Sequence, residues 1–189
     1  MSFRDVSVGR LLSLLAQRQP DREALVYSHE GLRWTFGELN DEARLVGRGL
    51  MAHGVRRGDH VAVWATNVPE WVVLQFALAK IGAILVTVNT SLKAAEIEYL
   101  LRQNETSTLI TIQGFRGVDY LRELRQVGAI GEEGRRRAQF PRLERVIFIG
   151  ADCPDELIAY HRVREAGHAV PGATLDLSLI HISEPTRRS

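Results

Sequence analysis

Residues 67–89 read NVPEWVVLQFALAKIGAILVTVN, and the first half of this run predicts a helix from its own local chemistry. Asn67 can cap the helix, and Pro69 suits a first turn in which a backbone N–H is not needed. Glu70 follows the cap by three residues, so its carboxylate meets the free N–H groups of the first turn. We therefore expect a helix to begin at this point.

The second half of the run predicts a turn and then a buried strand. Trp71, Leu74 and Leu78 recur at helical spacing, so we expect them on one buried face. Gly82 ends the helix, because glycine accepts the left-handed conformation that a helix stop often requires. Residues 84–88 are β-branched and apolar on both faces, as in a central parallel strand. Helix, tight turn and buried strand thus follow one another.

Similar strands recur along the chain between segments with helical spacing. Alternation of this kind implies right-handed strand–helix–strand units, and hence an α/β fold with a mostly parallel sheet and helices on both faces. The expected strands are residues 60–65, 84–88, 108–112 and 146–149, and the helices between and after them include residues 93–103 and 155–165.

The N-terminal part predicts two helices and a hairpin. Apolar residues at i, i+3, i+4 and i+7 mark an amphipathic helix that closes at Pro20, and a short hairpin follows around Gly31. Thr35 and Glu38 form a capping box for a second helix. The apolar residues of the first helix are Val8, Leu11, Leu12 and Leu15.

Composition excludes several classes of protein. The 189 residues are 45% hydrophobic and 25% charged with a net charge of +1, which is typical of a soluble globular domain and gives no argument for nucleic-acid binding. The longest apolar run contains Lys80, so we expect no membrane span. Cys153 is the one cysteine, which excludes an internal disulfide and fits the cytoplasm. We expect it to be a free surface thiol and not a nucleophile.

Several motifs in the chain resemble those of a known family. Asn-x-Pro-Glu-Trp, Lys-Ile-Gly-Ala and Val-x-Val-Asn in residues 67–89, with the Thr-x-x-Glu-Leu that starts at Thr35, resemble the N-terminal region of the AMP-forming acyl-CoA synthetases. These enzymes belong to the adenylate-forming superfamily. Within it the chain looks most like the medium- and long-chain fatty acyl-CoA ligases, in order and without large gaps over residues 8–170.

The resemblance implies a ligase that uses ATP, Mg²⁺ and CoA. The complete enzyme would convert a carboxylic acid, expected to be a fatty acid, to an acyl-adenylate and transfer the acyl group to CoA. The family's phosphate loop ends in Pro-Lys-Gly, and neither this tripeptide nor Thr-Gly-Thr occurs in the sequence. We therefore expect residues 1–176 to be a partial N-terminal domain that lacks the catalytic motifs, is inactive alone and binds none of these cofactors.

One candidate ligand contact follows from the resemblance. In some relatives a basic residue in the turn after the Val-x-Val-Asn strand approaches the CoA nucleotide. Here Ser91 stands where some relatives have arginine, and Lys93 lies nearby. The structural alternative is that Ser91 caps the next helix and Lys93 is a solvated first-turn residue, and the residue types favour it.

The last segment does not resemble the family. Residues 177–189 look like the translation of a sequencing adapter read in frame, so we expect an artefactual tail that takes no part in the fold. His181 is for this reason not a candidate ligand or base. His161 and His168 lie seven residues apart without carboxylate or cysteine partners at metal-ligand spacing, so no metal site is predicted.

Two other classes of function remain open from the residues alone. The first is a stand-alone, non-catalytic α/β module that binds a nucleotide or a small regulator. The second is a structural or interaction subunit. A natural stop codon would favour the first, and a stable protein partner would favour the second.

Overall fold

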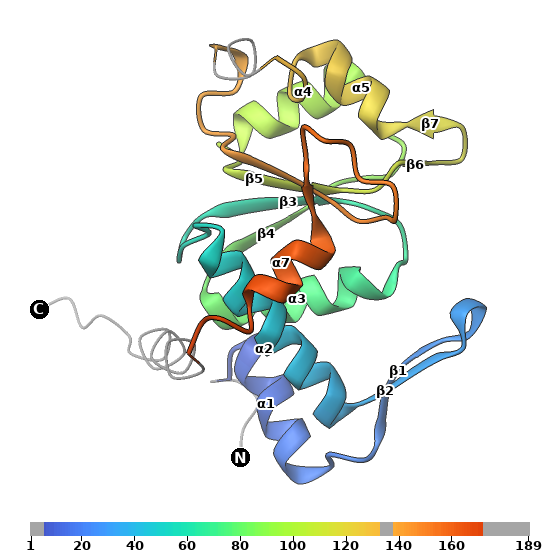
Figure 1. The fold of residues 1–189 in the computed structure, drawn as a ribbon, viewed down its shortest axis with the longest axis vertical. Helices are drawn as coiled ribbons and strands as arrows, with labels where there is room; N and C mark the ends of the chain where they lie inside the picture. The colour runs from blue at the N-terminus through green and yellow to red at the C-terminus, as the bar shows by residue number, and fades with distance from the viewer. Residues whose placement is uncertain (1–5, 133–137, 172–189) are drawn as a thin grey trace, which may run out of the picture. The chain divides into compact units, whose positions relative to one another are not determined.

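The computed structural model describes residues 6–132 and 138–171 of the chain, which divides into two compact units. The first unit contains Met1–Arg57 and Val72–Ala83, together with the segment that begins at Arg164. The second contains Gly58–Trp71 and Ile84–Val163. Figure 1 shows the elements of both units, which we describe one at a time.

The elements alternate as the sequence predicts. The helices are α1 (Val8–Arg18), η2 (Ser28–Glu30), α2 (Phe36–Ala52), α3 (Pro69–Ile81), α4 (Ala94–Gln103), α5 (Tyr120–Val127) and α7 (Tyr160–Ala166). The strands are β1 (Glu23–Tyr27), β2 (Leu32–Thr35), β3 (His60–Trp64), β4 (Ile84–Thr87), β5 (Thr108–Thr111), β6 (Gly114–Phe115), β7 (Val118–Asp119), β8 (Arg145–Phe148) and β9 (Ile158–Ala159).

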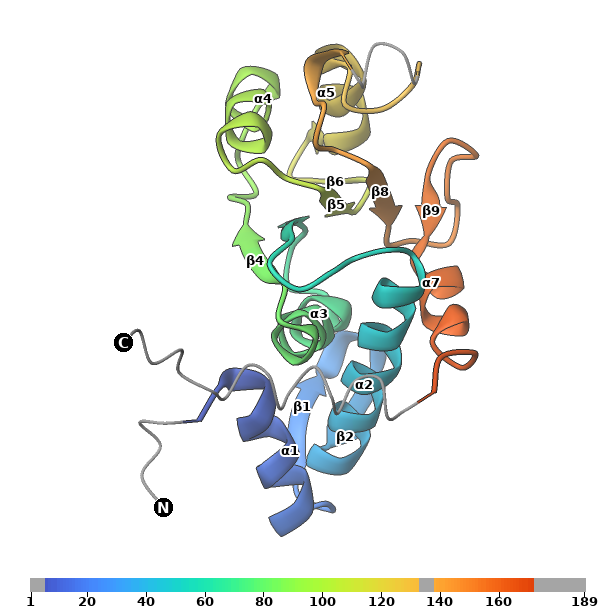
Figure 2. The same ribbon diagram turned by 90° about the vertical axis from the view of Figure 1, so that its left-hand side faces the viewer.

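In the first unit, α1 and α2 lie side by side (Figure 2), and the β1–β2 hairpin extends away from them (Figure 1). The hairpin is antiparallel as expected, and Gly31 adopts a φ of 64° at its turn. The predicted capping box of α2 is confirmed, because Thr35 and Glu38 exchange side-chain and backbone hydrogen bonds. Leu12 of α1 is buried as expected, whereas Val8 is exposed.

Lys80 is fully buried in this unit, although an isolated charge in a core is unfavourable. Its ammonium group donates hydrogen bonds to the Gly9 carbonyl (3.1 Å), the Ser13 hydroxyl (2.6 Å) and the Asn40 side-chain carbonyl (2.9 Å). A Cβ at position 9 would lie 2.9 Å from the backbone nitrogen of Lys80, so a glycine is required where α1 approaches α3. Lys80 therefore joins α1 and α2 to α3.

The second unit holds a five-stranded sheet in the order β4-β3-β5-β8-β9, with every pair parallel. Both faces of β3 are buried, because Val61 and Val63 point to one side, Ala62 and Trp64 to the other, and all four are inaccessible to solvent. On the second of these faces, α4 and α5 pack against the sheet (Figure 1). The parallel α/β architecture is thus confirmed.

Two expectations about the sheet are wrong. Residues 84–88 read as a central strand, but among the described strands β4 lies at one end of the sheet, and Ile84 is 47% exposed. The apolar composition of β4 does not show whether strands pair with it on both sides or on one side. Residues 155–165 read as one helix, but residues 158–159 form β9 and the helix begins only at Tyr160. A two-residue strand is too short to show a period.

The buried tryptophan of this region is Trp64 and not Trp71, which the helical spacing placed on a buried face. Trp71 is only half-buried, whereas Trp64 is fully buried and stacks on Tyr120 with ring centroids 3.9 Å apart and planes 13° from parallel. Leu74 and Leu78 are fully buried as predicted. Gly82 adopts a φ of 73°, and the Ala83 N–H donates to the Leu78 carbonyl, which confirms the glycine helix stop.

Candidate functional site

The carboxyl ends of parallel strands meet at one edge of a sheet, and open α/β sheets bind their ligands there. In this chain the turn after β4, residues 88–93, lies at that edge and contains both predicted contacts, Ser91 and Lys93. Both side chains are exposed. We call residues 88–93 the β4–α4 turn.

Hydrogen bonds within the turn fix its backbone. The Asn89 side-chain carbonyl accepts from the Ser91 backbone N–H (2.9 Å) and from the Ser91 hydroxyl (2.8 Å). The Lys93 backbone N–H donates to the Glu96 carboxylate at 2.9 Å, and α4 begins at Ala94. Ser91 is therefore not the helix cap that the sequence predicted, and Lys93 occupies the cap position instead of the first turn.

Three buried side chains form hydrogen bonds with the backbone of the turn and of the first residue of α4. Trp64 Nε1 donates to the Asn89 carbonyl (3.1 Å), and the Tyr120 hydroxyl donates to the Thr90 carbonyl (2.8 Å). The Glu123 carboxylate accepts from the first N–H of α4, at Ala94 (2.8 Å), close to the positive end of the helix. Burial raises the pKa of Tyr120 above its ordinary value, so the hydroxyl keeps its proton.

Sequence reasoning did not assign these three residues to the site. Trp64, Tyr120 and Glu123 lie 25 to 30 residues from the backbone groups that they bind. A local pattern carries no signal for such pairs. The polar end of a buried Trp or Tyr does need a hydrogen-bond partner, and this requirement is the general clue to the role of Trp64 and Tyr120.

The turn presents groups that can bind an anion. Lys93 offers one exposed cation, and the Ser91 hydroxyl already donates to Asn89. Among the described residues, no group of three or more His, Cys, Asp and Glu side chains could hold a metal ion. An anionic group could approach the exposed Lys93 side chain.

An apolar groove of about 470 Å³ runs along the outer side of α4. Leu92, Ala95, Tyr99 and Leu100 contribute its apolar wall, and Tyr99 is 68% exposed. Leu92 belongs to the β4–α4 turn, so the groove begins where the turn ends. We call this surface the α4 groove.

Cys153 lies in a small polar pocket of about 210 Å³ that His161 and Arg162 also line. The thiol is half-buried and not on the open surface, and it donates weakly to the carbonyls of Pro154 and Leu157. Burial raises its pKa above the ordinary value, more than Arg162 lowers it. Because the thiolate is the reactive form, Cys153 is not an activated nucleophile.

In the part of the chain that the structure describes, no helix is both long enough and apolar enough to cross a bilayer. The expected tail, residues 177–189, lies outside the described residues.

Comparison with known proteins now identifies the family. Residues 13–138 match the family described as AMP-binding enzyme. The chain is 40% identical over 152 residues to "Putative acyl-CoA synthetase YngI" of Bacillus subtilis, covering 76% of this chain and 27% of that protein. It is 37% identical over 156 residues to the mitochondrial medium-chain acyl-CoA ligase ACSF2 of Bos taurus, covering 80% and 25%.

The fold of the chain agrees with that match. The crystal structure of the anthranilate CoA ligase AuaEII in complex with anthranoyl-AMP superimposes with a TM-score of 0.72 and 26% identity, over 88% of this chain and 29% of that one. The chain therefore belongs to the AMP-binding enzyme family and corresponds to the N-terminal portion of its acyl-CoA synthetases. It spans about a quarter of the length of the curated relatives that it matches.

Proposed function

We propose that the chain is the N-terminal portion of an ATP-dependent acid–CoA ligase. The complete enzyme activates a carboxylic acid, in our proposal a fatty acid, as acyl-AMP and transfers the acyl group to CoA. The family match over residues 13–138 carries the proposal. The names of the relatives support the acyl-CoA chemistry, and the medium-chain ligases among them favour a fatty acid.

ATP, CoA and Mg²⁺ are the proposed cofactors of the complete enzyme. Among the described residues, no group of three or more His, Cys, Asp and Glu side chains is placed to hold a metal ion. The sequence also lacks the Pro-Lys-Gly that marks the family's phosphate loop. We therefore assign no step of the reaction to a residue of this chain.

Our proposal for the 189-residue chain by itself is that it does not activate acids. A pyrophosphate-release assay with a panel of carboxylic acids tests it. We expect no turnover from the chain alone and acid-dependent release from the product of the whole locus. If the chain alone turns over an acid and a point mutation within it abolishes the turnover, the proposed inactivity of the chain is wrong. If the product of the whole locus releases no pyrophosphate with any acid, the proposed ligase activity is wrong.

A contact of CoA with Ser91 and Lys93 of the β4–α4 turn is a further part of the proposal. Lys93 is exposed at the carboxyl edge of the sheet, where an anionic part of a nucleotide could reach it. In the complete enzyme, Lys93→Gln should raise the KM for CoA and leave the KM for ATP unchanged. Ser91→Ala serves as the comparison, because the Ser91 hydroxyl is engaged by Asn89.

A second candidate, a non-catalytic interaction module, is favoured by one observation. The α4 groove is apolar and exposed within the part of the chain that the structure describes. A stable protein partner that protects Tyr99 from solvent would support this function. For the location we propose the cytoplasm, on the strength of the single cysteine; fractionation of cells would test it, since relatives include mitochondrial ligases.

A further inference from the structure

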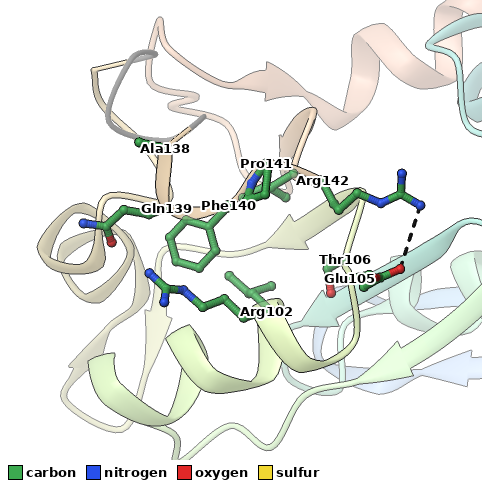
Figure 3. A pocket seen from close by; sticks show the side chains of 10 residues that line it. Arg102, Glu105, Thr106, Ala138, Gln139, Phe140, Pro141 and Arg142 are labelled. Atoms are coloured by element: carbon green, nitrogen blue, oxygen red, sulfur yellow. Dashed lines mark ion pairs between the residues drawn. The ribbon is translucent and has the colours of Figure 1, made fainter.

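A second cleft, of about 280 Å³, lies in the second unit away from the β4–α4 turn (Figure 3). One wall is the end of α4 with the turn that follows it, and the other is the segment 138–143 that leads to β8. Leu101, Phe140 and Leu143 form an apolar floor that belongs to the core of this unit. The volume is just below the range of about 300–1,000 Å³ typical of small-molecule sites, which suits a ligand of single-ring size.

Thr106 lines this cleft and carries the observation that points to a ligand. Its side chain is buried, and its hydroxyl has no hydrogen-bond partner within the described residues. Such a group is unfavourable, because it has lost its hydration and no described residue replaces the lost hydrogen bond. An oxygen atom of a ligand in the cleft would accept a hydrogen bond from this hydroxyl.

The rim of the cleft is positively charged. Its charged residues are Arg102, Arg142 and Glu105, two positive and one negative, and Figure 3 shows the two guanidinium groups at opposite ends. Arg142 and Glu105 form an ion pair at 3.8 Å with both side chains 70% exposed, and pairs of this kind contribute little. An incoming anion could replace Glu105 beside Arg142 at small cost.

Arg102 adds a flat surface to the other end. Its guanidinium lies over the ring of Phe140, 5.5 Å from the centroid, and also pairs with Glu98 at 3.0 Å. A guanidinium that stacks on one aromatic ring keeps a second face on which another flat ring can lie. The cleft thus combines one cation for an anion, one flat surface and one unused hydroxyl.

We propose that this cleft binds a small aryl oxyanion, a single aromatic ring that carries a carboxylate or a phosphate group. The oxyanion pairs with Arg142, the ring stacks on the face of the Arg102 guanidinium opposite Phe140, and Thr106 donates a hydrogen bond to a ligand oxygen. The site uses none of the residues of the β4–α4 turn and does not depend on the proposed ligase activity.

Ligand-observed NMR titration of the 189-residue chain tests the proposal. The probes are benzoate and phenyl phosphate, with benzamide as the neutral analogue and inorganic phosphate as the anion without a ring. We expect saturable binding of at least one aryl oxyanion, about tenfold tighter than benzamide because the charge-assisted bond to Arg142 is lost in the amide. The probe that binds more tightly shows whether the site prefers a carboxylate or a phosphate. Binding of inorganic phosphate as tightly as phenyl phosphate would contradict the role of the ring.

Three variants locate the binding. Arg142→Gln should weaken it about fivefold, whereas Arg122→Gln should not change it. Arg122 is a matched control, because its side chain is 69% exposed and pairs with Glu123 at 3.6 Å outside the cleft. Thr106→Val keeps the shape and removes the hydroxyl, so it should weaken binding without lowering the melting temperature. Absence of saturable binding, equal effects of the two arginine variants, or a Thr106→Val variant that melts earlier and binds normally would overturn the proposal.

Discussion

Lys80 is a charged residue in the core of the first unit, and its three observed acceptors belong to α1 and α2. Lys80→Ala would leave a cavity and remove these hydrogen bonds, so we expect it to lower the free energy of unfolding by about 3 kcal/mol. Lys80→Met fills most of the space and should cost less. Urea denaturation followed by circular dichroism measures both, and a loss below about 1 kcal/mol for the alanine variant would show that the contacts are dispensable.

Trp64 and Trp71 differ in burial, so substituting them should change the free energy of unfolding by different amounts. Trp64 is fully buried, stacks on Tyr120 and donates to Asn89, so Trp64→Ala should cost about 3–5 kcal/mol. Trp71 is only half-buried, so Trp71→Ala should cost about 1–2 kcal/mol. Denaturant titration of the two variants against the parent chain ranks them. A larger loss at Trp71 would restore it as the core anchor that its spacing suggested.

At the scale of the element, local features were predictable and partners distant in sequence were not. The capping box at Thr35 and the helix stop at Gly82 depend on neighbouring residues, so their patterns were sufficient. The end position of β4 and the anchoring of its following turn by Tyr120 depend on which segments meet in space. Ser91 stays a prediction that rests on the family resemblance, whereas the side chains that anchor its turn were not predicted.

The start of α2 makes a prediction about pH. Glu38 accepts hydrogen bonds from the Thr35 N–H and hydroxyl, mainly the first, and these hold the pKa of its carboxyl below the ordinary value of 4.5. A depressed pKa in the folded state stabilises the protein above the unfolded pKa, and the contribution is lost as the pH falls through the folded value. The parent chain should therefore melt above Glu38→Gln near about pH 7, and the difference should shrink near about pH 3. A difference independent of pH would exclude the charge as its cause.

At the scale of the whole molecule, the apolar surfaces of the second unit bear on how the chain behaves alone. Within the described residues, β4 ends the sheet with Ile84 47% exposed, and the α4 groove exposes Tyr99. An open strand edge with apolar side chains is a site for pairing between chains. The curated relatives are about four times longer than their match to this chain, so they have further residues that could cover such surfaces.

We accordingly expect the 189-residue chain to self-associate with rising concentration and to bind a hydrophobic dye, because solvent-exposed apolar surface drives both. Ile84→Lys should reduce both effects, since a charged residue on an edge strand opposes pairing between sheets. Val26→Lys is the matched control: Val26 is also 47% exposed on a strand, but in the β1–β2 hairpin of the first unit.

Light scattering after size exclusion gives the oligomer size of the three proteins at matched concentrations. A monodisperse parent chain without dye binding would contradict the prediction, and equal effects of the two lysine variants would show that added charge, and not the edge of β4, controls the association.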